Sequence, residues 1–289
     1  MSTRSVQVHP SGAVPRPDRC RAFAVVATSA VVAALATVVP AAPAMASTTY
    51  LVRQHDRSCS DSGPGHGSKP FCTISAAAKV AAAGDTVRVG AGTYREQVTP
   101  HSGVTFVGSR RSTEVVGSDS LASASWSPAG GNAWSTVLGG TSAVSQVFTG
   151  QTRLSRAAGA ARTATESWSF DAPTHTLYVD LGGPAPRPGN AIAAVVRQYG
   201  FLVRNVRGVT VKGFTMRHQG GAGILLDNST HCVVRSVTVT GSASYGINDQ
   251  GGTSDRIIRA HASHNASIGI RLFGTSSSSV TSSVSRSNG

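Results

Sequence analysis

The sequence is poor in acidic residues and in lysine. Its 289 residues include 26 Lys and Arg but only 13 Asp and Glu, and the formal net charge is +13. Lysine occurs only as Lys69, Lys79 and Lys212, so arginine supplies nearly all of the positive charge. A basic chain suits anionic partners such as uronic-acid polysaccharides or cell-wall polymers, although the same charge also serves solubility alone. The sequence has no basic helix and no strip of aromatic and basic residues, which argues against nucleic acid as the partner.

Long hydrophobic runs are also scarce, since the one long uncharged and apolar run extends from Ala22 to Val39. It follows several arginines and precedes the small-residue pattern Ala44-Met45-Ala46. This order is typical of an export signal, so we expect residues 1–46 to be removed and the rest to be secreted and extracellular. The run is just long enough for a membrane anchor, which is the alternative interpretation. Its weakly hydrophobic composition and the two prolines that follow favour cleavage, with no stable membrane insertion afterwards.

Cysteines are few, and they are not arranged in the pairs that zinc sites use. Cys20 lies in the predicted signal, while Cys59 and Cys72 flank the segment "SDSGPGHGSKPF". In an oxidising compartment, a disulfide between Cys59 and Cys72 is the natural expectation. Zinc binding by these two cysteines with His66 is the alternative, but no C-x-x-C motif supports it. Cys232 falls on an expected strand, where a free cysteine acts as a small buried hydrophobe.

The C-terminal part of the sequence contains a repeat of 23 residues. Ile224, Ile247 and Ile270 are separated by this step, and each follows a glycine. A second apolar column keeps the same step through Val211, Val234, Ile257 and Val280. A period in the low twenties, built from short strands and polar turns, is the signature of a solenoid. Leucine-rich repeats have a similar period, but their fixed leucines and asparagine are absent here.

Each repeat is better interpreted as three short strands joined by tight turns. The expected strands cover about 207–211, 214–217 and 222–226. When such repeats stack in register, each strand lies about 4.8 Å above its predecessor and the backbone groups are paired. The expected fold is therefore a parallel β-helix. In it the isoleucine column fills the interior, and the preceding glycine permits a bend at the start of the strand.

These motifs resemble a known family. Residues 196–289 resemble the right-handed parallel β-helix repeats of the pectin-lyase-like superfamily, and the segment "FCTISAAAKVAAAGDTVRVGAGTYREQV" is similar to the N-terminal entry of its secreted members. There Thr73 is expected to cap a short helix through about Ala83, which closes the hydrophobic end of the solenoid. The resemblance implies an all-β, right-handed parallel β-helix with an N-terminal capping helix and a β-rich insertion.

The expected domains follow from where the repeat holds and where it breaks. After the signal, residues 47–117 form the cap and the first rungs, 118–190 form the insertion, and 191–289 form the repeating rungs. The last rung stops partway, so we expect the family domain to continue beyond Gly289. We also expect the protein to be a monomer.

Residues 118–190 break the period and carry most of the large aromatic residues. The segment "SWSFDAPTHTLYVDLGG" predicts a hairpin that turns at Asp171 to Thr174. Trp126, Trp134, Trp168 and Tyr178 are candidates for a wall that stacks on sugar rings, with Trp168 and Tyr178 as substrate-binding residues. The alternative, that these aromatics are the insertion's own small core, is favoured because aromatic residues dominate such cores.

Alternation along the Gly-Ile strands predicts one functional face. If the isoleucines point inward, Asn248 and Arg271 point outward, and Asp227 and Gln250 follow on the same side. In the family, this sheet and its adjoining turn form the saccharide groove. Asp249 lies in a column of leucines, so either the strand has ended there or the carboxylate has a purpose.

The resemblance implies chemistry on polysaccharides, and β-elimination on a uronic-acid polymer is the leading hypothesis. Arg271 is the expected clamp or base, Asp227 and Asp249 are the other catalytic candidates, and the same two acids are the candidate Ca²⁺ ligands. Family calcium sites gather several acids, and the sparse acids here put such a site in doubt. A glycoside hydrolase and a non-catalytic binder of an anionic polysaccharide or cell-wall polymer are the alternatives.

Overall fold

A computed structural model describes residues 46–157, 165–187 and 191–289. All but the last residue of the predicted export signal lies outside these ranges, so its expected cleavage stays a prediction. In the described part of the chain, no helix has the length and apolar character needed to cross a membrane.

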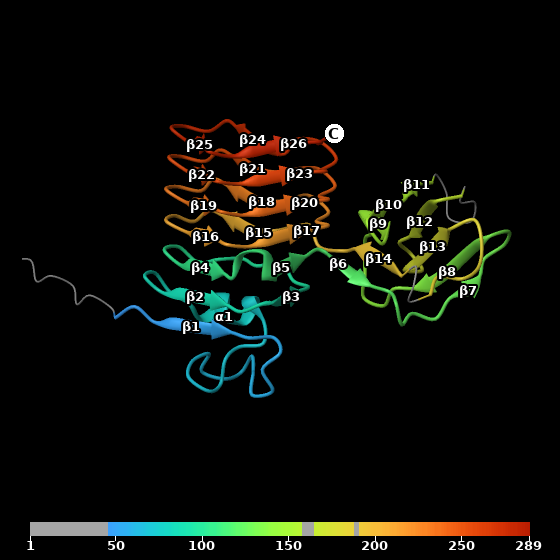
Figure 1. The fold of residues 1–289 in the computed structure, drawn as a ribbon, viewed down its shortest axis with the longest axis horizontal. Coiled ribbons are helices and arrows are strands. Elements are labelled where there is room, and N and C mark those ends of the chain that lie inside the picture. The colour runs from blue at the N-terminus through green and yellow to red at the C-terminus, as the bar shows by residue number, and fades with distance from the viewer. Residues whose placement is uncertain (1–45, 158–164, 188–190) are drawn as a thin grey trace, which may run out of the picture. The chain divides into compact units, whose positions relative to one another are not determined.

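Three parallel sheets form a solenoid, and their strands lie in successive layers in Figure 1. Sheet I contains β1 (Thr49–Val52), β2 (Thr86–Val89), β4 (Thr105–Gly108), β16 (Thr210–Lys212), β19 (Val233–Arg235), β22 (Arg256–Ile258) and β25 (Ser279–Thr281). Sheet II contains β15 (Tyr199–Arg204), β18 (Ala222–Asp227), β21 (Tyr245–Gln250) and β24 (Ile270–Phe273). Sheet III contains β3 (Gly92–Tyr94), β5 (Thr113–Val116), β17 (Thr215–Arg217), β20 (Thr238–Thr240), β23 (His261–Ser263) and β26 (Val284–Arg286).

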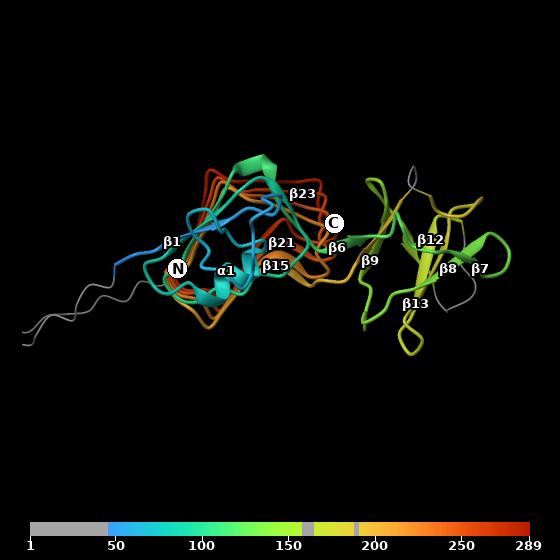
Figure 2. The same ribbon diagram turned by 90° about the horizontal axis from the view of Figure 1, so that it is seen from below.

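The rungs stack with the predicted register of 23 residues. In sheet I, Val211 pairs with Val234 and Val234 pairs with Ile257. In sheet II, Ile247 pairs with both Ile224 and Ile270. Figure 2 views the same layers from another side, with β15 and β21 nearly superimposed. Because successive rungs bury the same column of apolar side chains, the parallel β-helix expected from the repeat is confirmed.

The glycine before each isoleucine has a different role from the one we predicted. A Cβ atom on Gly246 would lie 2.4 Å from the carbonyl oxygen of Gly269, and one on Gly223 would lie 2.2 Å from Val239. Neither glycine has a positive φ. These positions therefore require glycine because the next rung and the interior side chains approach closely, and not because the backbone bends there.

The N-terminal helix α1 (Ile74–Val80) closes the solenoid as expected, although it ends before Ala83. The Thr73 side chain accepts a hydrogen bond from the amide of Ala76. Glu96 accepts two more, from the amides of Ile74 and Ser75, at 2.9 and 2.7 Å. These acceptors satisfy amide groups that the first helical turn leaves free.

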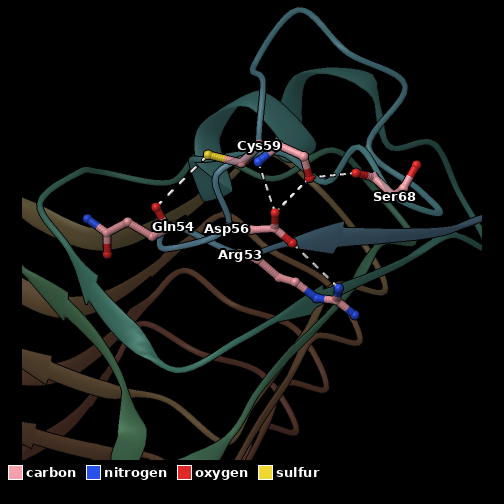
Figure 3. A network of polar contacts seen from close by, with 6 residues as sticks. Arg53, Gln54, Asp56, Cys59 and Ser68 are labelled. Carbon is pink, nitrogen blue, oxygen red and sulfur yellow. Dashed lines mark hydrogen bonds and ion pairs between the residues drawn. The ribbon is translucent and has the colours of Figure 1, made fainter.

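The disulfide between Cys59 and Cys72 is confirmed, with 5.0 Å between the Cα atoms. Since both sulfur atoms are bonded to each other, the zinc alternative is wrong. Just before the enclosed loop, Asp56 accepts hydrogen bonds from the amide and hydroxyl of Ser58 and lies 3.8 Å from Arg53 (Figure 3). The Ser58 hydroxyl also lies 2.6 Å from the carbonyl oxygen of Ser68 within the loop. Cys232 is free and buried, as expected.

The insertion consists of two further sheets. The first has the strand order β10 (Thr152–Arg153), β9 (Gln146–Thr149), β14 (Ile192–Val195) and β6 (Ser118–Ser120). The second has the order β11 (Ser155–Arg156), β12 (Ser167–Asp171), β13 (Thr176–Asp180), β8 (Ala133–Val137) and β7 (Ser127–Pro128). The predicted hairpin is present as β12 and β13. Strand β14 pairs with β9 and β6, so the insertion extends beyond residue 190, where we expected it to end.

The insertion has a hydrophobic core of its own. Trp168 is 1% exposed and packs with Leu177, Val179 and Ile192, while Trp126 and Trp134 lie against the same cluster. The tryptophans therefore hold the insertion together, which is the alternative favoured from the sequence.

Candidate functional site

The predicted functional face is the outward side of sheet II. Asp227, Asn248 and Gln250 are brought together there by a chain of hydrogen bonds. Gln250 Nε2 donates to Asp227 Oδ1 and Asn248 Nδ2 donates to Gln250 Oε1, both at 3.1 Å. The second oxygen of Asp227 accepts a hydrogen bond of 2.6 Å from Arg204 Nε. Both carboxylate oxygens are thus already engaged by protein groups.

Arg271 lies on the same face but is held by aromatic rings. Its guanidinium carbon is 5.0 Å from the centroid of the Tyr245 ring and 4.3 Å from that of Phe273. Such cation–π contacts stabilise the charged form and fix the side chain. Arg271 is in register with Asn248 on the neighbouring strand, but its guanidinium is directed to the two rings.

Asp249 does not belong to this face. Strand β21 continues through Gln250, so Asp249 points inward in register with Leu226 and Leu272, and it is 0% exposed. The prediction that it contacts substrate beside Asp227 is therefore not supported by its position. The two acids also point to opposite sides of the sheet, so they do not form the expected calcium pair. No group of three or more metal-binding side chains occurs in the described ranges.

The surroundings of Asp249 disfavour its charged form. Burial, together with the nearby charge of Asp255, raises the pKa of Asp249 to about 6. Asp255 is also 0% exposed, but it accepts hydrogen bonds from Ser229 and from the Cys232 amide. Neither oxygen of Asp249 has a partner in hydrogen-bond geometry, although Ser278 and the Gly252 amide lie close enough to lower its pKa slightly.

Trp168 and Tyr178, the aromatic candidates of the insertion, differ in how deeply they are buried. Trp168 lies in the core with the guanidinium of Arg156 5.2 Å from its ring centroid, so its faces are not open to a sugar. Tyr178 is partly exposed on β13, where it pairs with Ser169 and Ser135 of the flanking strands. The two residues do not form a common stacking wall.

Two adjoining hollows, which the sequence did not reveal, line sheet III and its turns. The first, of about 620 Å³, is lined by Phe148, Gln151, Arg153, His218, Thr240, Gly241, His264, Asn265, Ala266, Ser287 and Gly289. The second, of about 570 Å³, is lined by Arg111, Glu114, Thr215, Arg217, Thr238, Thr240, His261, Ser263 and Arg286. Thr240 belongs to both, and we call the two hollows together the basic trough.

The basic trough has a strongly one-sided charge. Its lining contains four arginines, three histidines and one carboxylate. That carboxylate, Glu114, lies 3.5 Å from the guanidinium of Arg217. Arg286 and Arg153 form no ion pair with any residue in the described ranges. The trough therefore presents excess positive charge to solvent.

The wall supplied by the insertion is fixed to the turns of the solenoid. Gln146 Nε2 lies 3.1 Å from the carbonyl oxygens of both Gln219 and Gly241. Arg153 reaches the carbonyl oxygens of Ser242 and His264 at 3.4 and 3.3 Å. These contacts join segments 73 to 111 positions apart in the sequence, so the trough is built by tertiary packing.

His218 is neutral within this wall. Burial, followed by the charges of Arg217, Arg153 and Arg95, lowers the pKa of His218 to about 4. A neutral imidazole is suited to its stacked position on the Phe148 ring.

One part of the basic trough could be expected from the sequence. Arg217, Thr240, Ser263 and Arg286 form one outward column of sheet III at the 23-residue step. The repeat predicts this column, but the wall contributed by Phe148 and Arg153 has no period from which it could be inferred.

Residues 199–289 match the family model of the right handed beta helix region. This region is a right-handed parallel β-helix. The match and the three parallel sheets confirm the expected right-handed parallel β-helix fold. No curated protein sequence matches the chain.

Solved structures with a similar β-helix include the complex of XylC with xylose, at 18% identity and a TM-score of 0.58. That alignment covers 75% of this chain and 53% of the other, so the chain spans about half the length of that protein. A glycoside hydrolase has 9% identity and a TM-score of 0.58, covering 77% of this chain and 68% of the other. Pectate lyase Pel9A has 14% identity and a TM-score of 0.47, covering 82% and 47%. At these identities the likeness concerns the fold.

Proposed function

We propose that this is an exported, polysaccharide-active β-helix protein that binds an anionic polysaccharide in the basic trough and cleaves it by β-elimination. The observation that carries the proposal is the lining of four arginines and three histidines with a single carboxylate. Excess positive charge in a hollow attracts a polyanion, and guanidinium groups pair well with carboxylates. The two similar structures named for xylose and for glycoside hydrolysis support a saccharide as the ligand class.

β-Elimination requires two kinds of group, and the trough contains both. An arginine neutralises the uronate carboxylate, which makes the hydrogen on the adjacent carbon more acidic, and a base removes that proton. The electron pair of the broken C–H bond forms a C=C bond, the glycosidic C–O bond breaks, and the departing oxygen takes up a proton. A hydrolase of the usual kind needs two carboxyl groups across the scissile bond, and the trough lining contains only Glu114.

His261 is our candidate for the base. It lies on the outward side of β23 and lines the hollow that also contains Arg217 and Arg286. His218 is less suitable because it is stacked on Phe148 and its pKa is low. The earlier set on sheet II, with Arg271 as base and Asp227, Asn248 and Gln250 as contacts, is the alternative location of the site.

The test is incubation of the secreted protein with pectate, alginate and glycosaminoglycans. Unsaturated product is detected by its ultraviolet absorbance, with and without a chelator. We expect absorbance with at least one of these polymers, and a loss of at least a hundredfold in His261→Ala that is not seen in the exposed control His55→Ala. New reducing ends without absorbance would replace the lyase by a hydrolase, and binding without products would leave a non-catalytic binder. Loss of activity in Arg271→Ala but not in His261→Ala would move the site to sheet II.

A further inference from the structure

A second cationic surface lies on the outward side of sheet I. Arg88, Lys212, Arg235 and Arg256 alternate there with buried residues of the interior columns, and all four are exposed. We call these four residues the basic sheet face. The strands of sheet I contain no acidic residue, and none of the four cations forms an ion pair within the described ranges. The basic sheet face is made of strands other than those of the basic trough.

The fold gains nothing from this arrangement. Lys212 and Arg235 are directly in register on neighbouring parallel strands, which lie about 4.8 Å apart. Arg256 follows on the next rung, in register with Val233. Like charges that face each other across a strand pair destabilise a sheet. The same outward column carries Thr281 on the last rung, so an uncharged polar residue fits the position equally well.

We infer that the basic sheet face is a second binding site, for a linear polysaccharide with repeated carboxylate groups. Lys212, Arg235 and Arg256 lie on three successive rungs, with Arg256 displaced by two residues along its strand, while β4 separates Arg88 from Lys212. A polymer with repeated anionic groups can contact several of these cations at once and relieve the repulsion between them. At one end of the basic sheet face, Arg88 lines a hollow of about 260 Å³ that contains no carboxylate. The role of the basic sheet face is to hold the protein on an anionic matrix. This inference is independent of the function proposed for the basic trough.

The test is retention of the purified protein on beads carrying polygalacturonate or polyphosphate, with elution by a salt gradient. The variant Lys212→Gln/Arg235→Gln/Arg256→Gln should bind at least tenfold more weakly and elute at lower salt. The control Arg57→Gln/Lys79→Gln/Arg156→Gln removes three exposed cations elsewhere and should elute close to the wild type. Circular dichroism and thermal unfolding confirm that both variants fold.

Equal retention of the two variants would overturn the inference, because it would show that only net charge matters. Tighter retention on polyphosphate than on polygalacturonate would overturn the choice of a carboxylate polymer. To separate this site from the trough, the same substitutions are repeated in an Arg217→Gln/Arg286→Gln background. A further loss of binding there supports two sites, whereas no further loss overturns the second site. Because the readout is binding, its outcome does not depend on whether any polymer is cleaved.

Discussion

The ring of Phe148 stacks on the imidazole of His218, with 3.9 Å between the centroids and 16° between the planes. Phe148 belongs to the insertion and His218 to a turn of the solenoid, so this pair forms part of the joint that builds the basic trough. Arg153 lies 5.7 Å from the Phe148 centroid and adds a positive charge nearby. Protonation of His218 would place two cations against one ring.

This pair predicts a loss of stability in acid. The pKa of His218 is about 4 in the folded protein, below its ordinary value of 6.5, so the unfolded chain binds the proton more readily. The contribution of His218 is therefore complete above pH 6.5 and is lost as the pH falls toward 4. With an allowance for partial exposure, the loss is about 1–2 kcal/mol. Denaturant unfolding at pH 7 and pH 4.5 should show a smaller acid loss in His218→Phe than in the wild type. An equal loss in both would contradict the assignment.

Asp249 predicts the opposite dependence on pH. Its pKa is raised to about 6 from 3.8, so the folded protein retains a proton that the unfolded chain releases between these values. The free energy of unfolding therefore decreases as the pH rises from about 4 to 6, by about 2–3 kcal/mol from this group. Asp249→Asn should remove that decrease, and Asp249→Leu should be more stable than the wild type at pH 7 because Leu226 and Leu272 occupy the same column. Denaturant titrations at pH 4 and pH 7 make the comparison. A destabilised Asp249→Leu protein at pH 7 would show that the carboxylate has a partner.

Gln146 predicts how the wall of the trough is attached. Gln146→Ala removes the shared donor of two buried carbonyl groups, at Gln219 and Gly241, and should cost about 1–3 kcal/mol. Hydrogen exchange should show faster exchange at β9 and β14, with sheet I unchanged. Gln151→Ala is the matched control, since Gln151 is exposed and its side-chain oxygen accepts a hydrogen bond from the Arg217 guanidinium. Similar exchange in both variants would mean that other contacts hold the wall.

The glycine column predicts a steric effect. Gly246→Ala places a methyl group 2.4 Å from the Gly269 carbonyl oxygen, a backbone atom that cannot rotate away. The rungs must separate locally, which should destabilise the protein by about 1–3 kcal/mol. Gly139→Ala is the control, because its Cβ would meet nothing within 4 Å and its φ is not positive. Thermal unfolding should separate the two variants. An equal Tm would show that the column is kept for another reason.

The sequence predicts the solenoid well because one local rule repeats. Since Val211, Val234 and Ile257 share a side-chain type and a step, the register of sheet I follows from spacing alone. The same alternation places Asn248 and Arg271 on the outward side, but it gives no information about their partners. The sequence did not decide whether the strand continues through Asp249, because the end of β21 depends on its pairing with β24. Such boundaries are not fixed by the short-range pattern.

The repeat gives one column of the basic trough, from Arg217 to Arg286, but the rest of the trough could not be predicted from the sequence. Its two walls come from segments with unrelated patterns, joined through contacts such as Gln146 with Gln219 and Phe148 with His218. Long-range packing of this kind leaves no periodic trace. The disulfide was predictable because the expected export and the short spacing of Cys59 and Cys72 limit the choices.

The constant register of the rungs bears on how such a molecule can change during evolution. Each rung contacts only the rungs directly before and after it. Duplication of a 23-residue stretch would therefore add one rung and leave the contacts among the other rungs in place. The solenoid can therefore lengthen by whole rungs, whereas Gln146 must stay level with its partners Gln219 and Gly241. Added rungs therefore disturb the structure least where they do not separate Gln146 from these two residues.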